Sequence, residues 1–319
     1  MRLDPDDVAR ARERIAPYLR PTPLRRSFAV ASPATYLKLE CWQPTGSFKV
    51  RGAVNHLKAL PPEARARGIV AASAGNHALG VAFAVQALGG GIHATLVVPE
   101  SAPRAKVEKL RSFPVTVIEK GATYDEAHAE ALLVAERTGA RYLHAYEDRL
   151  TASGQGTIGL EILEELPDVG AIVVPVGGGG LISAIAVAVK AVRPEVRIVA
   201  VQPEASPSLR ESIRQGRALH EYPAGPTLAD GIAGGVGDIA FDHRDLIDEI
   251  VEVGEPEIEE ALTALVARDQ VIAEASGAVV VAALRSGRTG PLQARPAVAV
   301  VSGANIDARV LARILSSRA

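Results

Sequence analysis

The stretch AIVVPVGGGGLISAIAVAVKAV, residues 171–192, joins two patterns that belong to different elements of structure. Its first six residues form a continuous run of apolar side chains, which is typical of a strand covered on both faces of a parallel sheet. The residues after the glycines are apolar and numerous enough to form a buried helix. The stretch therefore predicts one strand-turn-helix unit of an α/β fold.

The turn of this unit consists of Gly177, Gly178, Gly179 and Gly180. Consecutive glycines favour neither a helix nor a strand, because glycine loses more conformational entropy on folding than other residues do. They allow a ligand to approach the backbone closely, with the N–H groups at the start of the following helix directed at an anion. We expect a phosphate group there, although a flexible turn without a ligand would have the same sequence. The spaced GxGxxG pattern of dinucleotide-binding folds is absent after the first strand.

Strand and helix patterns alternate along most of the chain. Apolar runs of strand length occur at residues 69–72, 93–99, 115–119, 141–144, 171–176, 197–202, 247–253 and 297–302. Segments with helical periodicity lie between them, such as 76–88, 123–138, 156–166, 180–193, 255–268 and 305–316. We therefore expect an α/β fold with mainly parallel sheets flanked by helices, in which ligands bind at the carboxyl ends of the strands.

The composition excludes several classes of function. The chain has 319 residues, of which 48% are hydrophobic and 23% charged, and its formal net charge is −2. Such a balance gives no basic surface for nucleic acid or a membrane. No apolar run approaches the roughly 18–20 residues that span a bilayer, and the N-terminus lacks the apolar region of a signal peptide. Because Cys41 is the single cysteine, no internal disulfide can form. These features predict a cytoplasmic protein.

The stretch PTGSFKVRGA, residues 44–53, places Lys49 at the start of an expected helix. The positions three or four residues away on the same helical face are uncharged: Thr45, Gly46, Gly52 and Ala53. A surface lysine usually has a carboxylate at one of these spacings or is surrounded by water. The uncharged face suggests that these small residues leave room for a ring beside the Lys49 side chain.

Two further strand ends carry short polar residues. Ser73, Gly75 and Asn76 follow the strand at 69–72, and Ser302 follows the strand at 297–302. N–H groups and short side chains at a helix start suit a carboxylate or a polar ring substituent. Asn76 is equally consistent with a plain helix cap, and His77 with a packed or solvated histidine. Together with Lys49 and the glycine turn, these groups could hold pyridoxal 5′-phosphate, whose aldehyde forms a Schiff base with a lysine.

Seven motifs in order along the chain resemble one family of enzymes. They are RPTPL (20–24), KLECWQPTGSFKVRGA (38–53), ASAGNHALGVA (72–82), GQGTIGLEI (154–162), PVGGGGLISA (175–184), TLADGIA (227–233) and SGANID (302–307). This series resembles the fold-type II pyridoxal-phosphate enzymes, specifically the serine/threonine dehydratase (threonine deaminase) and serine racemase family. The resemblance implies a two-domain fold like that of the tryptophan synthase β chain. Residues 1–58 and 146–319 would form a large cofactor-binding domain, and residues 59–145 a small mobile domain that closes over the substrate.

The resemblance also implies a role for each site residue. Lys49 would carry the cofactor and act as the catalytic base, with Phe48 beside the ring and Asn76 bonded to the ring hydroxyl. Gly177, Gly178, Gly179, Gly180 and Leu181 would bind the phosphate. Ser302 would face the pyridine nitrogen, and the Gly231 backbone would lie close to the cofactor. The loop of Ser73, Ala74, Gly75, Asn76 and His77 would bind the substrate carboxylate.

By the same resemblance, the expected reaction is α,β-elimination from L-threonine or L-serine, which yields 2-oxobutyrate or pyruvate and ammonia. The partner is a small β-hydroxy amino acid, and the family suggests a homo-oligomer, a dimer or a tetramer. Other readings stay open: another substrate such as 3-hydroxyaspartate, a serine racemase, a β-replacing synthase related to cysteine synthase, or a non-catalytic protein that binds the cofactor.

Several positions depart from the family pattern. Racemases need a serine as a second acid/base where this chain has Ala74, so we expect elimination rather than racemisation. Metal-dependent members have Glu and Asp at the positions of Gln202 and Ser208, and we therefore expect no metal. Many dehydratases have Gln in place of Leu79, which leaves the substrate preference open. The chain ends at residue 319, and we expect no regulatory domain after it.

Overall fold

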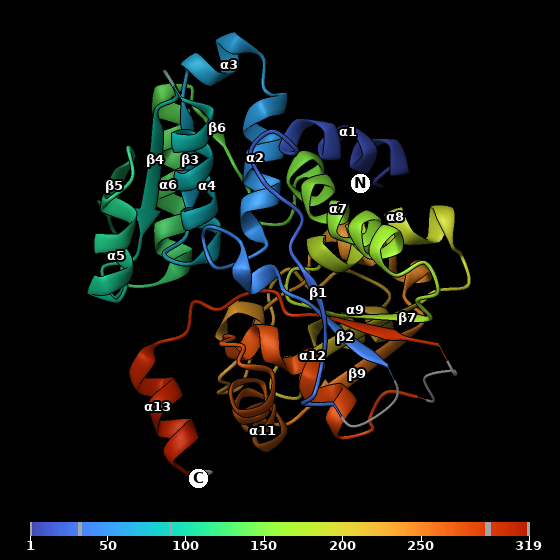
Figure 1. The fold of residues 1–319 in the computed structure, drawn as a ribbon. Coiled ribbons are helices and arrows are strands. Elements are labelled where there is room, and N and C mark those ends of the chain that lie inside the picture. The colour runs from blue at the N-terminus through green and yellow to red at the C-terminus, as the bar shows by residue number, and fades with distance from the viewer. Residues whose placement is uncertain (1, 31–33, 90, 291–294, 318–319) are drawn as a thin grey trace.

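Two sheets form the framework of this computed structural model, which describes residues 2–30, 34–89, 91–290 and 295–317 (Figure 1). The smaller sheet has the order β5-β4-β3-β6. Its strands are β3 (Ile69–Ala72), β4 (Ala94–Val98), β5 (Thr116–Glu119) and β6 (Arg141–Tyr142). The larger sheet has the order β1-β2-β10-β7-β8-β9. Its strands are β1 (Leu24–Arg26), β2 (Thr35–Lys38), β7 (Ala171–Pro175), β8 (Arg197–Pro203), β9 (Glu249–Val253) and β10 (Ala297–Val300).

Neighbouring strands in both sheets run parallel, and β1 with β2 is the antiparallel exception within the described residues. Parallel strands need a crossover connection, which the intervening helices supply. The predicted α/β class with mainly parallel sheets is therefore confirmed.

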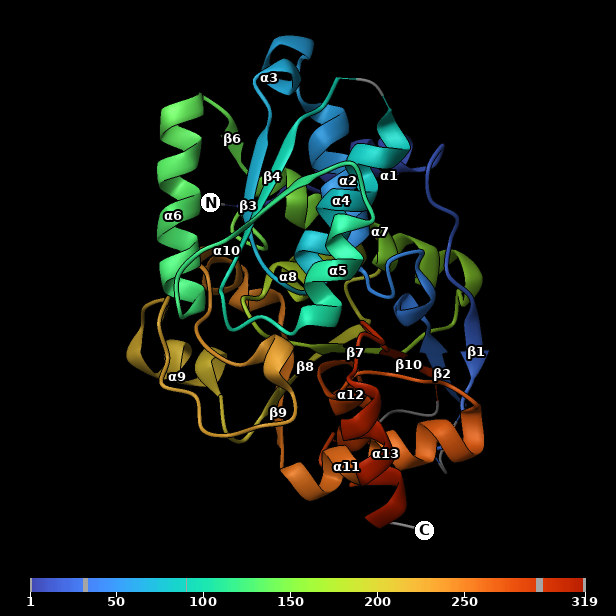
Figure 2. The same ribbon diagram turned by 90° about the vertical axis from the view of Figure 1, so that its left-hand side faces the viewer.

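Helices cover both faces of the smaller sheet (Figure 2). On one face, Val70 and Val97 pack against α6 (Tyr124–Thr138). On the other face, Ile69 and Leu96 share a buried cluster with α4 (Asn76–Leu88) and α2 (Lys49–Ala59). Of two shorter helices, α5 (Arg104–Arg111) adds Val107 and Leu110 to this cluster, and α3 (Pro62–Ala66) buries none of its residues. Burial on both faces explains why these strands have no alternation of polar and apolar residues.

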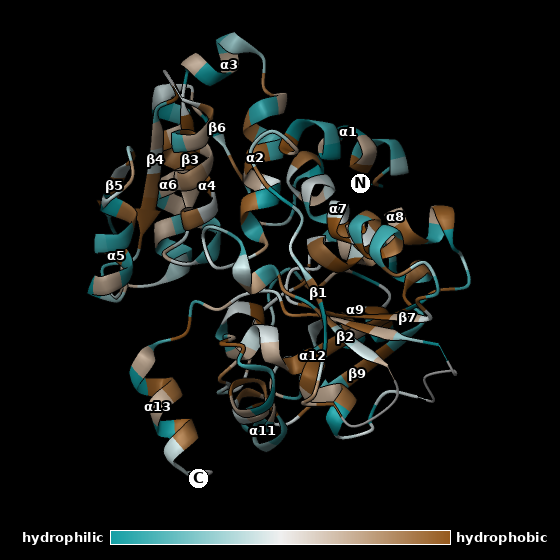
Figure 3. Ribbon diagram, in the orientation of Figure 1, coloured by the Kyte–Doolittle hydropathy of each residue, from teal (hydrophilic) through white to brown (hydrophobic). Residues whose placement is uncertain are grey.

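The larger sheet is covered in the same way. Helices α7 (Arg149–Glu165) and α8 (Gly180–Val192) pack against one face, where Ile172 and Ile198 are buried. Helices α11 (Glu255–Ala264) and α12 (Ala275–Arg285) pack against the other face. The remaining α-helices are α1 (Pro5–Ile15), α9 (Ser208–Gln215), α10 (Asp238–Asp242) and α13 (Ala308–Ser317). Figure 3 shows the resulting contrast between the hydrophobic strands β4 and β7 and the largely hydrophilic helix α1.

The helix boundaries follow the sequence signals where those signals are strong. Helix α4 spans the predicted residues 76–88, and α1 begins after Asp4, whose side chain accepts a hydrogen bond from the Asp6 N–H. Helix α7 begins at Arg149, seven residues before the predicted start, because Asp148 caps it and its first turns hold small and polar residues. Among the helices of the described segments, none combines the length and apolar character that a membrane span requires.

A buried ionic cluster holds α2 in place. Arg51 is 1% exposed and forms ion pairs with Glu40 at 2.8 Å and with Glu161 of α7 at 2.6 Å. The Lys38 Nζ, which is also buried, lies 2.8 Å from Glu161. Guanidinium and carboxylate groups in such paired geometry are strongly directional. The cluster therefore fixes both the position and the rotation of the helix that begins with Lys49.

The predicted domain boundaries at residues 58/59 and 145/146 remain a prediction. The division of the strands supports it, because all four strands of the smaller sheet come from residues 69–142. Helix α2 packs against α4, which covers the smaller sheet, and against α7, which covers the larger sheet. It therefore connects the two sheets.

Candidate active site

The carboxyl ends of β3, β7 and β10 open onto one cavity of about 1030 Å³. Its size is at the upper end of the range for small-molecule sites, about 300–1,000 Å³. Every residue that the sequence suggested for the site lines this cavity: Phe48, Lys49, Ser73, Ala74, Gly75, Asn76, His77, Gly177, Gly178, Gly179, Gly180, Leu181, Gly231 and Ser302. Residues from distant parts of the chain therefore meet in one place, as the strand-end argument predicts.

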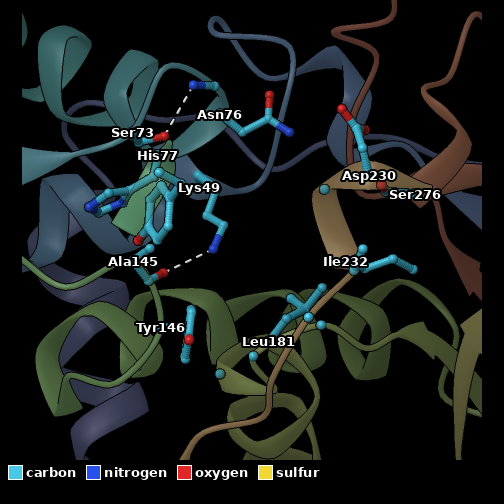
Figure 4. A pocket seen from close by; sticks show the side chains of 18 of the residues that line it. Lys49, Ser73, Asn76, His77, Ala145, Tyr146, Leu181, Asp230, Ile232 and Ser276 are labelled. Atoms are coloured by element: carbon cyan, nitrogen blue, oxygen red, sulfur yellow. Dashed lines mark hydrogen bonds between the residues drawn. The ribbon is translucent and has the colours of Figure 1, made fainter. Parts of the chain in front are cut away.

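Lys49, the first residue of α2, extends its side chain into the cavity (Figure 4). Its Nζ donates a hydrogen bond to the carbonyl oxygen of Ala145 at 2.9 Å. No carboxylate of a described residue lies within salt-bridge distance of this amine. Burial lowers the pKa of Lys49 to about 8, and the charge of Glu274 opposes this shift only in part. The amine is thus prepared for nucleophilic and base chemistry near neutral pH.

The small residues around Lys49 have a different purpose from the one expected. A Cβ atom on Gly52 would lie 2.5 Å from the Thr151 carbonyl oxygen of α7, and one on Gly46 would lie 3.0 Å from the Asn305 side chain. The prediction that these glycines leave room for a ring was therefore wrong. Gly52 allows α2 and α7 to approach closely, while Gly46 has a φ angle of +75° that favours glycine.

The four-glycine turn lies between β7 and the start of α8, with protein packed closely against it. A Cβ atom would come within 2.9 Å of Ile232 at Gly177, 2.4 Å of the Tyr146 ring at Gly178 and 2.2 Å of Ala240 at Gly179. Side chains are thus excluded from the turn on steric grounds. Because α8 begins at the last of these glycines, the N–H groups of its first turn have no acceptor within the helix. Free N–H groups at a helix start can bind an anion, and these line the cavity.

Asn76, at the start of α4, is hydrogen-bonded to two residues from the part of the chain that forms the larger sheet. Its Nδ2 donates to Glu274 at 2.7 Å, and its Oδ1 accepts from Asn305 Nδ2 at 2.7 Å. The helix-cap reading was wrong, because α4 begins at Asn76 itself and its side chain makes no capping hydrogen bond. These two bonds use one N–H of the amide, and the other N–H could donate to a ring hydroxyl.

Glu274 is a functional residue that the sequence did not reveal. It lines the cavity directly before α12, and burial raises its pKa to about 7. Nothing in the surrounding sequence ASGAVVV distinguishes this glutamate from a solvent-exposed helix start. Its importance comes from Asn76, which is 198 residues away along the chain.

Phe48 and Ser302 both line the cavity and are joined by a backbone hydrogen bond. The Phe48 N–H donates to the Ser302 carbonyl at 3.0 Å, and the Phe48 ring centroid lies 5.1 Å from Lys49 Nζ. This contact joins the end of β10 to the start of α2. In the loop after β3, the Ser73 hydroxyl accepts the Gly75 N–H at 3.1 Å and so shapes the turn that precedes α4.

Two cavity residues have buried polar atoms without a partner among the described residues: Ser276 Oγ and His77 Nδ1. His77 Nε2 lies 2.9 Å from the Leu143 carbonyl and donates to it, and burial holds the pKa of His77 at about 3. Its Nδ1 is therefore an acceptor. Unsatisfied buried polar groups are costly unless a ligand or water satisfies them. The Lys49 amine and the N–H groups at the start of α8 are the cavity groups that suit a phosphorylated aldehyde such as pyridoxal phosphate.

Gln202 and Ser208 lie within hydrogen-bond distance of each other, in a form that does not suit a cation. Gln202 is fully buried, its Nε2 lies 3.3 Å from Ser208 Oγ, and its Oε1 accepts the Leu209 N–H at 3.0 Å. Amide hydrogens point to the place where a cation would need oxygen lone pairs. The described residues contain no group of three or more His, Cys, Asp or Glu side chains arranged for a metal.

A cavity that combines an amine with a lowered pKa and a glycine-rich helix start able to bind an anion has the features of an enzyme of the pyridoxal-phosphate class. The family model described as pyridoxal-phosphate dependent enzyme matches residues 15–303, and the chain belongs to this family. The predicted family and cofactor are thereby confirmed.

Individual relatives are consistent with this assignment. The L-threonine ammonia-lyase of Thermotoga maritima is 48% identical over 283 residues, which cover 88% of this chain and 69% of the relative. The structure of maize serine racemase has a TM-score of 0.91 at 34% identity and covers 99% of this chain and 98% of its own. A processed threonine deaminase from Solanum lycopersicum has a TM-score of 0.90 at 32% identity, with coverage of 98% and 88%.

Proposed function

We propose that this protein is an ammonia-lyase that converts L-threonine, L-serine or both into the corresponding 2-oxo acid and ammonia by α,β-elimination. The observation that carries the proposal is the Lys49 amine, which lies in the cavity without a carboxylate partner among the described residues. The 48% identity to an L-threonine ammonia-lyase supports the substrate class.

In this proposal, residues that line the cavity would bind each part of pyridoxal phosphate. The turn from Gly177 to Gly180, with Leu181, would bind the phosphate through backbone N–H groups, and the dipole of α8 favours its negative charge. Asn76 would donate to the ring hydroxyl, Ser302 would face the pyridine nitrogen, and Phe48 would lie beside the ring. When bound, the cofactor supplies an aldehyde that condenses with amines and a ring that withdraws electrons from the Cα of an amino acid.

Lys49 has two tasks in this proposal. Its Nζ would hold the cofactor through the aldehyde, and as a free amine the same Nζ would take the proton from the substrate Cα. A pKa lowered to about 8 keeps a useful fraction of this amine neutral near pH 7. The hydrogen bond to the Ala145 carbonyl holds the amine while its lone pair remains available.

The loop from Ser73 to His77 would bind the substrate carboxylate. Its N–H groups lie at the start of α4, where the helix dipole favours a negative charge. The β-hydroxyl leaves as one water, and one water is taken up later when the imine is hydrolysed. The net products are therefore one 2-oxo acid and one ammonia per amino acid. Ala74 lines the cavity without an acidic or basic atom. A site with one base favours elimination over racemisation, although the fold is also that of serine racemases.

The test is a panel of L-threonine, L-serine and 3-hydroxyaspartate, with 2-oxo acid and ammonia both quantified. Lys49→Ala should remove both turnover and the Schiff-base absorbance while leaving the protein folded. Lys106→Ala is the matched control, because Lys106 also lines the cavity. Full turnover by Lys49→Ala would refute the proposal. Cofactor binding without release of 2-oxo acid by the wild type would instead identify a non-catalytic binding protein.

The cytoplasmic location and the assembly into a dimer or tetramer stay predictions. Light scattering on the purified protein would test the second one directly.

A further inference from the structure

The segment between β6 and α7 passes from the smaller sheet to the larger one directly beside Lys49. The Leu143 N–H donates to the Val70 carbonyl of the smaller sheet at 2.8 Å. Two residues later, the Ala145 carbonyl accepts the hydrogen bond from Lys49 Nζ. The Tyr146 ring then packs against Gly178 of the anion-binding turn. We call residues 143–148 the crossover segment. Its conformation decides where the acceptor for the Lys49 amine lies.

His144 folds this segment into a tight turn. Its Nδ1 accepts hydrogen bonds from two backbone N–H groups, those of Glu147 at 2.9 Å and Tyr146 at 3.3 Å. The His144 ring also meets the Tyr146 ring edge-on, with 4.6 Å between centroids. On its other side it contacts the rings of Tyr142 at 6.1 Å and His128 at 6.3 Å. His144 is thus anchored in the smaller sheet while it shapes the backbone that follows.

The chemistry of these contacts fixes the protonation of the ring. Both partners of Nδ1 are N–H donors, so Nδ1 has no proton and the neutral ring carries its hydrogen on Nε2. Burial, followed by the nearby His128 and Lys49, lowers the pKa of His144 to about 4. The acceptor at Nδ1 is therefore present throughout the physiological pH range.

We propose that His144 is a positioning residue for proton transfer: by accepting the N–H groups of Tyr146 and Glu147, it sets the turn that presents the Ala145 carbonyl to the Lys49 amine. This inference rests on the proposed function, in which that amine takes the Cα proton. Among the described residues, the Ala145 carbonyl is the one hydrogen-bond partner of Lys49 Nζ. A lysine side chain has four rotatable carbon–carbon bonds and needs such an anchor to keep one geometry. A misplacement of about 1 Å in a reacting group can cost about 100-fold in rate.

Two variants separate the hydrogen bond from the loss of the ring. In His144→Asn, Oδ1 is two bonds from Cβ, as Nδ1 is in histidine, so it can accept the same two N–H groups. In His144→Gln the acceptor lies one carbon further out. Both variants lose the ring contacts. We expect kcat for L-threonine to fall about 100-fold in His144→Gln and to stay within about tenfold of the wild type in His144→Asn.

The decisive measurement is the isotope effect on kcat with L-threonine deuterated at Cα. If the Lys49 amine is misplaced, proton transfer limits the rate, so the isotope effect should increase in His144→Gln and return toward the wild-type value in His144→Asn. A loss of folded protein would lower kcat without changing the isotope effect. His144→Ala carries the same expectation as His144→Gln and replaces it if that variant does not fold. Equal isotope effects in all variants, or equal increases in the Asn and Gln variants, would overturn the inference.

A second readout does not depend on the proposed reaction. The rate at which Lys49 of each full-length variant takes up pyridoxal phosphate, followed by the Schiff-base absorbance, should fall in His144→Gln and be preserved in His144→Asn. If the wild type forms the Schiff base but releases no 2-oxo acid, the proposed function fails while this readout still tests His144. Equal uptake rates in wild type and His144→Gln would count against the inference in that case.

Discussion

Replacing Gly179 by alanine tests whether the four-glycine turn is held in place by the protein around it. Gly179 has a φ angle of +90°, and a Cβ atom there would lie 2.2 Å from the Cβ of Ala240 in α10. Two costs therefore add. The left-handed backbone costs a residue with a Cβ about 1–2 kcal/mol, and an extra methyl group in a packed site costs about 1–3 kcal/mol. We expect Gly179→Ala to lower the free energy of unfolding by about 2–5 kcal/mol.

Gly216→Ala provides the matched control. Gly216 has a φ angle of +70° at the end of α9, but no atom lies within 4 Å of the position of its Cβ. This variant should therefore show the backbone cost of about 1–2 kcal/mol alone. The double variant Gly179→Ala with Ala240→Gly removes the clashing methyl group and should recover the packing part of the loss, apart from the cost of about 1 kcal/mol for a helical glycine.

Urea unfolding of each variant with and without pyridoxal phosphate measures both effects. The turn must move to relieve the clash, and its N–H groups are the proposed phosphate donors, so Gly179→Ala should also weaken cofactor binding by tenfold or more, where each tenfold corresponds to about 1.4 kcal/mol. Gly216→Ala should bind the cofactor as the wild type does. If Gly179→Ala binds pyridoxal phosphate with unchanged affinity, the turn is not the phosphate site.

Three further variants test other parts of the site. Ala74→Ser should add racemisation, seen by chiral analysis of recovered serine; no change would mean that more than this side chain blocks the second face. Glu274→Gln removes a negative charge that favours the Lys49 ammonium, and should therefore lower the pKa of Lys49. Because uptake of pyridoxal phosphate needs the neutral amine, the pH midpoint of uptake should fall below about 8. An unchanged or higher midpoint would contradict the electrostatic argument. Arg51→Met leaves the buried Glu40 without its ion-pair partner, while Glu161 keeps Lys38, and should destabilise the fold by about 3–5 kcal/mol in denaturant titrations; a loss under 1 kcal/mol would show that the ionic cluster does not hold α2.

The strand-end argument predicted the architecture and most of the cavity because it depends on local sequence. An unbroken apolar run, as in residues 171–176, indicates a buried strand. The residue after such a run lies at the carboxyl end of the sheet, where ligands bind. Parallel strands bring such edges together, so Asn76 and Ser302 line one cavity with the glycine turn, and Lys49 reaches it from the start of α2. The short strands β1 and β2 escaped this reasoning, since each has at most four residues and β1 contains two arginines.

The contacts that tune these residues could not be predicted, because each depends on a partner distant in sequence. Glu274 matters because Asn76 donates to it and because its charge acts on Lys49, and His144 because its ring nitrogen accepts the two N–H groups that shape the crossover segment. Neither residue stands in a pattern that differs from ordinary helix or loop sequence. The explanation for Gly52 was wrong for the same reason: the helix that excludes its side chain, α7, begins 97 residues later.

The reactivity of Lys49 follows from how the first turn of α2 places Lys49 and Arg51. Lys49 and Arg51 are two residues apart, which turns them about 200° around the helix axis, at 3.6 residues per turn. Arg51 therefore faces away from the cavity and pairs with the buried Glu40 and Glu161. The carboxylates that would otherwise stabilise a buried ammonium are committed to the opposite side of the helix. Lys49 is left with a carbonyl oxygen as its partner, and burial can then lower its pKa to about 8. A structural ion cluster on one face of α2 thus leaves a reactive amine on the other.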